Sequence, residues 1–413
     1  MIYTDTNGSI MHSYNLRNSK KNPAIKAKSF LKPYVTPNLS ANSIAAIPPQ
    51  YFSGSQLREL YNIPTVPVSN KKTTIAIIIA FTYPKLKADL ETYWKNPINF
   101  GPDSIPPTIN VYTMTGATQN SGWAQEECLD VQIICTMNPN ANICVVEAKS
   151  DYNIDLLNAV NYATNTLKAD VVSMSWGVNE SPQLTSSNVA FINTGVCYCA
   201  ATGDSNTVSW PATNANCIAV GGTSLIWTPT TTPERTEYPY KLAGCGYSSI
   251  IQQPNYQTGI PNILHKYRSV PDVSMVADTN TSVYTVYNGN WYGVGGTSVS
   301  TPIFAGILSL ANQQRFNAGK SALTTVYNKS PNTPTNNTYI PPANHLQTYL
   351  YKSVYTNSTT YKSAFYDIIL GTNAGSVSNS STLTTYSAGS GYDVTTGLGS
   401  PNAKNLCNLL LNL

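Results

Sequence analysis

The dominant pattern in the chain is an alternation of short apolar runs and amphipathic stretches that begins near residue 73. The run at 74–81 (TIAIIIAF) is rich in β-branched residues without polar alternation, which is typical of a parallel strand buried on both faces. The stretches between such runs carry apolar residues at helical spacing. We expect strands at 74–81, 141–148, 170–175 and 196–201, and helices at 56–61, 89–93, 126–136, 151–167 and 298–314.

Repeated units of strand and helix predict an α/β fold, with a mostly parallel sheet covered by helices on both faces. In such folds, sites form at the carboxyl ends of the strands. Residues 1–45 are polar and basic without periodicity, so we expect an N-terminal arm followed by one domain over 46–413. We expect long loops and hairpins over 225–290, and loops over 328–360, where Asn, Thr and Pro are frequent.

The charge of the chain argues against nucleic acid as a partner, because the net charge is only +4 and is scattered. Charged residues make up 11% of the chain, so few native ion pairs can be lost at low pH and we expect tolerance of acid. No run of 18 apolar residues and no apolar leader occurs, so the sequence predicts neither a membrane span nor an ordinary signal peptide. The compartment stays open.

The eight cysteines are expected to be mostly buried thiols. Cys128 and Cys135 lie about 10 Å apart along one expected helix, which is too far for a disulfide. Cys197 and Cys199 share one face of one strand and are poorly placed to pair. No CxxC metal pattern occurs.

The first candidate for chemistry is the sequence GGTS at 295–298, which leads into an expected helix. A helix N-terminus offers unpaired N–H groups and positive potential, which would stabilise an alkoxide or oxyanion at Ser298. Pro302 is tolerated in the first turn of such a helix. The alternative is that Thr297 or Ser298 only caps the helix.

A serine nucleophile needs a base, and no histidine is well placed for that role. His12 lies in the arm, and His265 and His345 lie in loop-like segments without a partner motif. The base should therefore be a carboxylate.

Glu126 and Asp130 are the candidate pair, because their i, i+4 spacing places both on one helix face. Two carboxylates as close as these tend to share a proton. Glu126 could therefore accept a serine proton while Asp130 holds Glu126 in place. The alternative is two solvated acids on a helix surface. Glu127 should point about 100° away from the pair. Asp204, just beyond the strand at 196–201, is a further candidate unless it only forms a turn.

Together these motifs resemble those of the sedolisin family, the serine-carboxyl peptidases with a subtilisin-like fold. The matches follow the family's order, and the similarity runs from about residue 48 to the C-terminus. The matching motifs are EECLD at 126–130, SMSWG at 173–177, GDS at 203–205, GGT at 221–223, PDVS at 271–274 and GTSVSTP at 296–302.

The resemblance implies a three-layer, subtilisin-like α/β domain and a peptidase that acts at acid pH. Ser298 would be the nucleophile and Glu126 the general base and later acid, oriented by Asp130. Asp204 would lie in the oxyanion hole beside the Ser298 N–H, protonated so that it can donate a hydrogen bond. The substrate would be a peptide or protein, cut by an endopeptidase or a tripeptidyl-peptidase, and the enzyme would be a monomer.

The resemblance also implies how substrate and metal are bound. Ser175, Trp176 and Gly177 would pair with the substrate backbone as an added strand. One calcium ion would be held near the C-terminus by oxygen atoms, with water completing the shell. Its ligands would be the carboxylates of Asp367 and Asp393 and the carbonyl oxygens of Ile368, Gly389 and Gly391. Two ordinary Gly/Asp turns are the alternative to a metal site.

Two features depart from the family's pattern. Only the short arm precedes the catalytic region, where most members have a long prosegment. Ile79 stands where some members carry a further glutamate beside the catalytic pair, so we expect that extended network to be absent. A catalytically silent structural or packaging protein that retains the peptidase fold, and a carbohydrate- or surface-binding module, stay open as alternatives.

Overall fold

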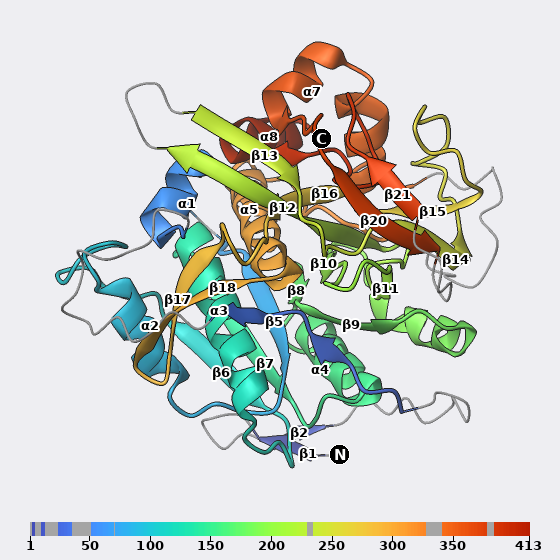
Figure 1. The fold of residues 1–413 in the computed structure, drawn as a ribbon. Helices are drawn as coiled ribbons and strands as arrows, with labels where there is room; N and C mark the ends of the chain where they lie inside the picture. The colour runs from blue at the N-terminus through green and yellow to red at the C-terminus, as the bar shows by residue number, and fades with distance from the viewer. Residues whose placement is uncertain are drawn as a thin grey trace.

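A computed structural model describes residues 2–4, 10–12, 24–34, 51–69, 71–228, 234–327, 341–377 and 384–413. Its centre is one large sheet (Figure 1). The sheet contains, in chain order, β5 (Thr74–Ala80), β6 (Ile109–Thr113), β7 (Asn142–Ala148), β8 (Val171–Met174), β10 (Cys197–Ala201), β12 (Cys217–Thr228), β13 (Glu234–Pro239) and β16 (Val273–Val276).

The strand order of this sheet is β13-β12-β10-β8-β5-β7-β6, and β16 also pairs with β12. Among these strands only β13 pairs antiparallel to its neighbour, and the other pairings are parallel. Register between β5 and β7 runs without a break from Thr74 opposite Asn142 to Ala80 opposite Ala148. The expected mostly parallel α/β sheet is confirmed.

Smaller sheets surround the central one. Their strands are β1 (Ile2–Thr4) with β2 (Ile10–His12); β3 (Lys28–Ser29), β9 (Trp176–Asn179) and β11 (Ser209–Trp210); β4 (Lys32–Tyr34), β17 (Val283–Tyr287) and β18 (Asn290–Gly295); β14 (Gly246–Gln252), β15 (Tyr267–Val270), β20 (Thr372–Val377) and β21 (Thr384–Ser387); and β19 (Phe365–Tyr366) with β22 (Ser400–Pro401).

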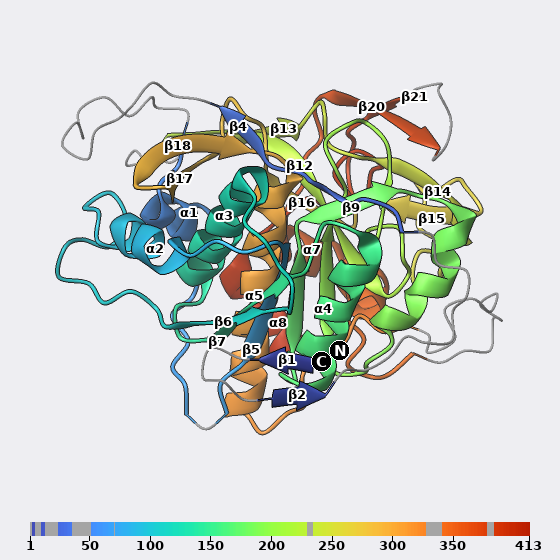
Figure 2. The ribbon, with the colours of Figure 1, turned by 90° about the horizontal axis from the view of Figure 1, so that it is seen from below.

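Helices cover both faces of the central sheet and so make three layers. Figure 2 shows α3 and α5, which contact each other, on one side and α4 on the other. None of the described helices is both long enough and apolar enough to span a membrane. The helices are α1 (Gly54–Leu60), α2 (Leu86–Trp94), α3 (Ser121–Met137), α4 (Asn153–Asn165), η2 (Pro182–Phe191), α5 (Thr297–Asn317), α6 (Leu346–Tyr349), η3 (Leu350–Val354), α7 (Ser358–Ala364) and α8 (Ala403–Leu411).

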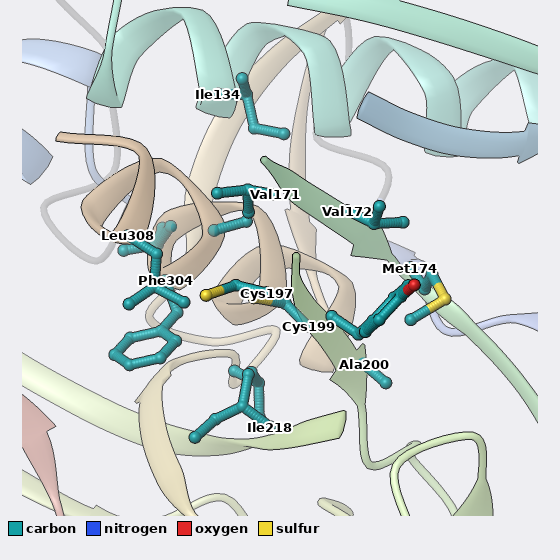
Figure 3. Packing of buried hydrophobic residues seen from close by; sticks show 14 of the residues in the cluster. Ile134, Val171, Val172, Met174, Cys197, Cys199, Ala200, Ile218, Phe304 and Leu308 are labelled. Atoms are coloured by element: carbon teal, nitrogen blue, oxygen red, sulfur yellow. The ribbon is translucent and has the colours of Figure 1, made fainter. Parts of the chain in front are cut away.

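The main core lies between the sheet and α5. Figure 3 shows Cys197 of β10 beside Phe304 and Leu308 of α5, with Val171 of β8 close by. All eight cysteines are buried and unpaired, as their spacing predicts. The apolar runs of the strands form this core because both faces of a central parallel strand are covered by helices.

One stretch expected to be loop is helical. α6, η3 and α7 follow one another between residues 346 and 364. Leu346, Leu350 and Val354 repeat at every fourth position and are fully buried, but the surrounding Thr, Ser and Asn residues weaken this stripe in the sequence. The expectation of a loop over 346–360 is therefore wrong, and residues 328–340 lie outside the described residues.

Candidate active site

Glu126 and Asp130 lie on α3 and are completely buried, so they are not solvated surface acids. α3 begins at Asn120, whose side chain accepts hydrogen bonds from two backbone N–H groups of the first turn. From Glu126 to the helix end every side chain is buried, because α3 packs against α2, α5 and the central sheet. This packing places both carboxyl groups in the interior, one helical turn apart.

Burial raises the pKa of Glu126 well above its usual range, and the neighbouring Asp130 raises it further. The Ser298 hydroxyl and the Leu31 N–H, which donates to Glu126 Oε2 at 3.0 Å, lower this pKa in part. Burial also raises the pKa of Asp130 to about 8. Glu126 Oε1 and Asp130 Oδ2 have no hydrogen-bond partner of good geometry among the described residues. Two buried acids so close titrate as one pair, and at least one of them keeps its proton through the acid range.

Ser298 is the second residue of α5, and its side chain does not cap the helix. The N-cap is Gly296 at a φ of +109°, and no side chain caps this end of the helix from within. Ser298 Oγ donates to the Ser175 carbonyl oxygen at 3.3 Å. The capping alternative for Thr297 or Ser298 is therefore wrong.

Pro302 is the sixth residue of α5 and lies beyond the first turn where we expected it. Proline has no N–H, so the carbonyl oxygen of Ser298 lacks its usual helical donor. Ser175 Oγ lies 3.4 Å from that oxygen and donates to Asp130 Oδ1 at 2.7 Å. Ser175, between β8 and β9, thus connects the serine helix to the acid helix.

Asp204 lies in the turn after β10, and its carboxyl group binds the N-terminus of α5. The Thr297 N–H donates to Asp204 Oδ1 at 2.9 Å, and the Gly203 N–H donates to Thr297 Oγ1 at 3.1 Å. Asp204 Oδ2 is buried and has no partner among the described residues. Burial raises the pKa of Asp204 to about 7, against the lowering effect of the bonds from Thr297 and the charge of Lys32. The carboxyl group is therefore protonated in acid and free to donate from Oδ2.

The segment Ser175, Trp176 and Gly177 carries an added strand in this structure. Lys28 lies opposite Gly177 and Ser29 opposite Trp176 in an antiparallel ladder. Extended backbone can therefore pair with this segment.

A second buried acid pair, Glu127 and Glu147, is a feature that the motif spacing did not predict. Glu127 points away from the first pair and is buried beside Glu147 of β7. Glu147 accepts hydrogen bonds from the Tyr83 N–H at 3.1 Å and from Thr113 Oγ1. Burial first, and then the nearby Glu147, raise the pKa of Glu127. Ile79 lies opposite Glu147 across the strand pair, so a neighbouring strand supplies an acid here.

The described histidine side chains have other partners. His345 is buried, caps α6 by accepting from the Thr348 N–H at 3.1 Å, and has its pKa lowered to about 4 by burial. The ring of His265 packs against Tyr247 and Tyr267. No hydrogen bond joins either histidine to Ser298 in the part of the chain that the structure describes.

Four of the five candidate calcium ligands are joined in two pairs by hydrogen bonds near the C-terminus. The Gly391 N–H donates to Asp367 Oδ2 at 2.9 Å, and the Gly389 N–H donates to Asp393 Oδ2 at 3.4 Å. Ile368 follows Asp367 directly. Burial raises the pKa of Asp393 to about 6, while hydrogen bonds from Thr395 lower it. Two carboxyl groups thus accept hydrogen bonds from the backbone of one glycine-rich loop.

The fold and the convergence of a serine with buried acids define the class: an α/β protein of subtilisin-like architecture. A model of the subtilase family matches residues 110–365. Kumamolisin from Bacillus sp. (strain MN-32) is 29% identical over 342 residues, covering 75% of this chain and 55% of kumamolisin. Tripeptidyl-peptidase 1 from Homo sapiens is 26% identical over 276 residues, covering 59% of this chain and 43% of the relative.

A solved structure of Pseudomonas sedolisin, a serine-carboxyl proteinase complexed with two molecules of pseudo-iodotyrostatin, shares the fold. It matches with a TM-score of 0.68 at 21% identity and covers 87% of this chain and 97% of that chain. The chain spans about half the length of the curated relatives it matches. It belongs to the subtilase family.

Proposed function

We propose that this protein is a serine-carboxyl peptidase that hydrolyses peptide bonds at acid pH. One observation carries the proposal: Ser298, the buried pair of Glu126 and Asp130, and Asp204 meet at the N-terminus of α5, joined through Ser175 and Thr297. Every group that peptide hydrolysis requires is present in this set. It contains a nucleophile, a proton acceptor with a partner, and donors for an oxyanion.

In the proposed reaction, Ser298 Oγ attacks the carbonyl carbon of the substrate while Glu126 accepts the hydroxyl proton. Asp130, fixed by the Ser175 hydroxyl, orients Glu126. The oxyanion takes hydrogen bonds from protonated Asp204 and from the Ser298 backbone N–H. Glu126 then returns its proton to the leaving amine, and water hydrolyses the acyl-enzyme by the reverse sequence.

The substrate of this reaction is an extended peptide. Trp176 and Gly177 support this proposal, since backbone pairing at their edge fixes a chain without selecting its side chains. We expect the protein to act as a monomer, because the groups of the proposed site all come from one chain. Product analysis on a long peptide would separate an endopeptidase from a tripeptidyl-peptidase, which releases three residues at a time.

We also propose that one calcium ion binds between Asp367 and Asp393. Asp367 Oδ2 accepts one hydrogen bond and so retains a lone pair for a cation, and one of the two hydrogen bonds to Asp393 Oδ2, from the Gly389 N–H, is long at 3.4 Å. The carbonyl oxygens of Ile368, Gly389 and Gly391 would complete the protein ligands. A bound cation would hold the loop at 389–393 against the end of β19, and its role would be structural.

Cleavage of a peptide library across pH 3 to 7 tests the proposed function. We expect activity at acid pH that is lost in Ser298→Ala and in Glu126→Gln. A protein that cuts nothing across this range would favour the alternative of a catalytically silent structural protein. Equal cleavage by wild type and Ser298→Ala would exclude Ser298 as the nucleophile.

A further inference from the structure

The hairpin formed by β17 and β18 leads directly into the proposed nucleophile. β18 ends at Gly295, Gly296 is the N-cap of α5, and Ser298 is the second residue of that helix. The two strands pair without a break, with Val286 of β17 opposite Trp291 of β18. Figures 1 and 2 both show the hairpin beside α3. A shift of this hairpin on α3 would therefore move the nucleophile relative to the acids.

Gln132 of α3 is completely buried and binds the backbone of this hairpin. Its Nε2 donates to the Val286 carbonyl oxygen at 2.7 Å, and the Val286 N–H donates to its Oε1 at 2.9 Å. The amide thus exchanges both of its bonds with one residue, as a neighbouring strand would. Among the described residues, no other side-chain hydrogen bond joins α3 to the hairpin.

The same helix presents the proposed base and its partner. Gln132 follows Asp130 by two residues, so the two side chains leave α3 about 200° apart. α3 therefore holds its acid pair on one side and the nucleophile's hairpin on another. Because buried backbone groups without partners are costly, the paired amide fixes where Val286 lies on α3.

Other contacts hold the hairpin together without Gln132. Asp89 of α2 accepts hydrogen bonds from the two turn residues, from the Asn288 N–H at 2.8 Å and from the Gly289 N–H at 2.9 Å. The hairpin also packs in a small apolar cluster that is separate from the main core and contains Tyr51, Tyr93, Tyr284, Val286 and Trp291. Loss of the Gln132 amide should therefore leave the hairpin folded but less firmly placed on α3.

A second buried glutamine makes the same pair of bonds away from the site. Gln257 donates to the Ser269 carbonyl oxygen at 2.8 Å and accepts from the Ser269 N–H at 3.0 Å. Ser269 belongs to β15, and the sheet of β15 supplies none of the proposed reacting groups. If both glutamines only satisfied buried backbone, their removal would have the same consequences. A role in catalysis would distinguish Gln132 from Gln257.

We propose that Gln132 is a positioning residue of this peptidase, which holds the hairpin leading into Ser298 at a fixed place on α3, beside the buried acid pair. The inference rests on the proposed function. Gln132 acts through Val286 and β18 and is not itself a reacting group. Its loss should lower kcat, since a displacement of about 1 Å between reacting groups can cost about 100-fold. The KM should change little, because the substrate backbone would pair with β9.

The kcat and KM for one peptide at pH 4 test this inference in wild type, Gln132→Met and Gln257→Met. Methionine has the length of glutamine but cannot replace its amide bonds. Both variants should unfold at a lower urea concentration than wild type, since each leaves two buried backbone groups without partners. We expect only Gln132→Met to lose kcat, by about 100-fold, with little change in KM.

Gln132→Glu provides a second test that does not depend on the methionine variant. A protonated glutamate can donate to the Val286 carbonyl oxygen and accept from the Val286 N–H, whereas an ionised glutamate cannot donate. Burial favours the protonated form. The kcat of this variant should therefore be close to that of wild type at pH 4 and should fall relative to wild type once the pH removes that proton.

The outcomes separate this inference from the proposed function. If wild type cuts the peptide and folded Gln132→Met loses no more kcat than Gln257→Met, the inference is overturned and the proposed function stands. The same holds if folded Gln132→Glu has lost the activity of wild type at pH 4. If wild type itself cuts nothing, the proposed function fails and the inference fails with it.

Discussion

The protonation of Asp204 offers the sharpest prediction of the pH dependence. Its carboxyl group must carry a proton to donate to an oxyanion, and burial raises its pKa to about 7. About one tenth of the molecules keep this proton at pH 8 and about one hundredth at pH 9. Loss of one oxyanion donor costs about 100- to 1,000-fold in kcat. The wild-type kcat/KM should therefore fall about tenfold per pH unit above 7.

Asp204→Asn isolates this effect. Asparagine has the same shape, its oxygen can keep the bond from the Thr297 N–H, and its NH₂ group donates at every pH. The variant should lose the alkaline fall in kcat/KM. Asp170→Asn is the matched control, because Asp170 is also a buried acid with a raised pKa but pairs with Lys71 outside the site. An alkaline fall that is the same in Asp204→Asn and wild type would refute the reasoning.

The same group gives a signed prediction for stability. The pKa of Asp204 is raised on folding, from 3.8 to about 7, so the folded state binds the proton more tightly than the unfolded state. The free energy of unfolding should therefore decrease as pH rises from about 4 to 7, by about 4 kcal/mol in total from this group. Asp204→Asn should be more stable than wild type at pH 8 and similar to it at pH 4, as measured by urea unfolding. A stability difference that does not change with pH would contradict the assigned pKa.

Three further predictions concern other groups. Glu127→Gln should raise the free energy of unfolding at pH 8 and leave it unchanged at pH 4, because glutamine resembles the protonated form of Glu127, which burial beside Glu147 favours. A loss of stability at both pH values would contradict this prediction. Calcium should raise the Tm of wild type, and Asp393→Ala should abolish that response; calcium that leaves the wild-type Tm unchanged would remove the metal proposal. His345→Asn keeps a helix cap and removes a ring whose pKa falls from 6.5 to about 4 on folding. The free energy of unfolding should therefore decrease by about 3 kcal/mol in wild type alone as pH falls from 6.5 to 4. Parallel curves of stability against pH for the two proteins would contradict this.

Much of the fold follows from local sequence. The run at 74–81 predicts β5 because strands buried on both faces need apolar, β-branched residues throughout. The spacing of Glu126 and Asp130 predicts their common helix face, and the motifs place Ser298 and Asp204 near them. Each of these features depends either on residues close together in the sequence or on the order of strands and helices that an α/β sheet requires.

The remaining features depend on contacts between distant residues. Glu147 of β7 meets Glu127 of α3 only through the tertiary fold, and no spacing in the sequence relates them. The segment around Phe30 has few strand-forming residues, and it is extended because β9 and β18 offer unpaired edges. The helices after residue 346 have a buried stripe too short to stand out among polar neighbours. In each case tertiary contacts determine the local conformation.

The central claim is that Ser298 reacts through a carboxylate base and without histidine. The most direct measurement is the kcat/KM for one peptide at pH 4, with wild type, Ser298→Ala, Glu126→Gln and His345→Asn compared after their folding has been checked. We expect the serine and glutamate variants to lose activity by at least about 1,000-fold, in line with the loss of a nucleophile or its base, and the histidine variant to retain it. Activity that survives in Ser298→Ala, or that disappears in His345→Asn while the protein stays folded, would contradict the account.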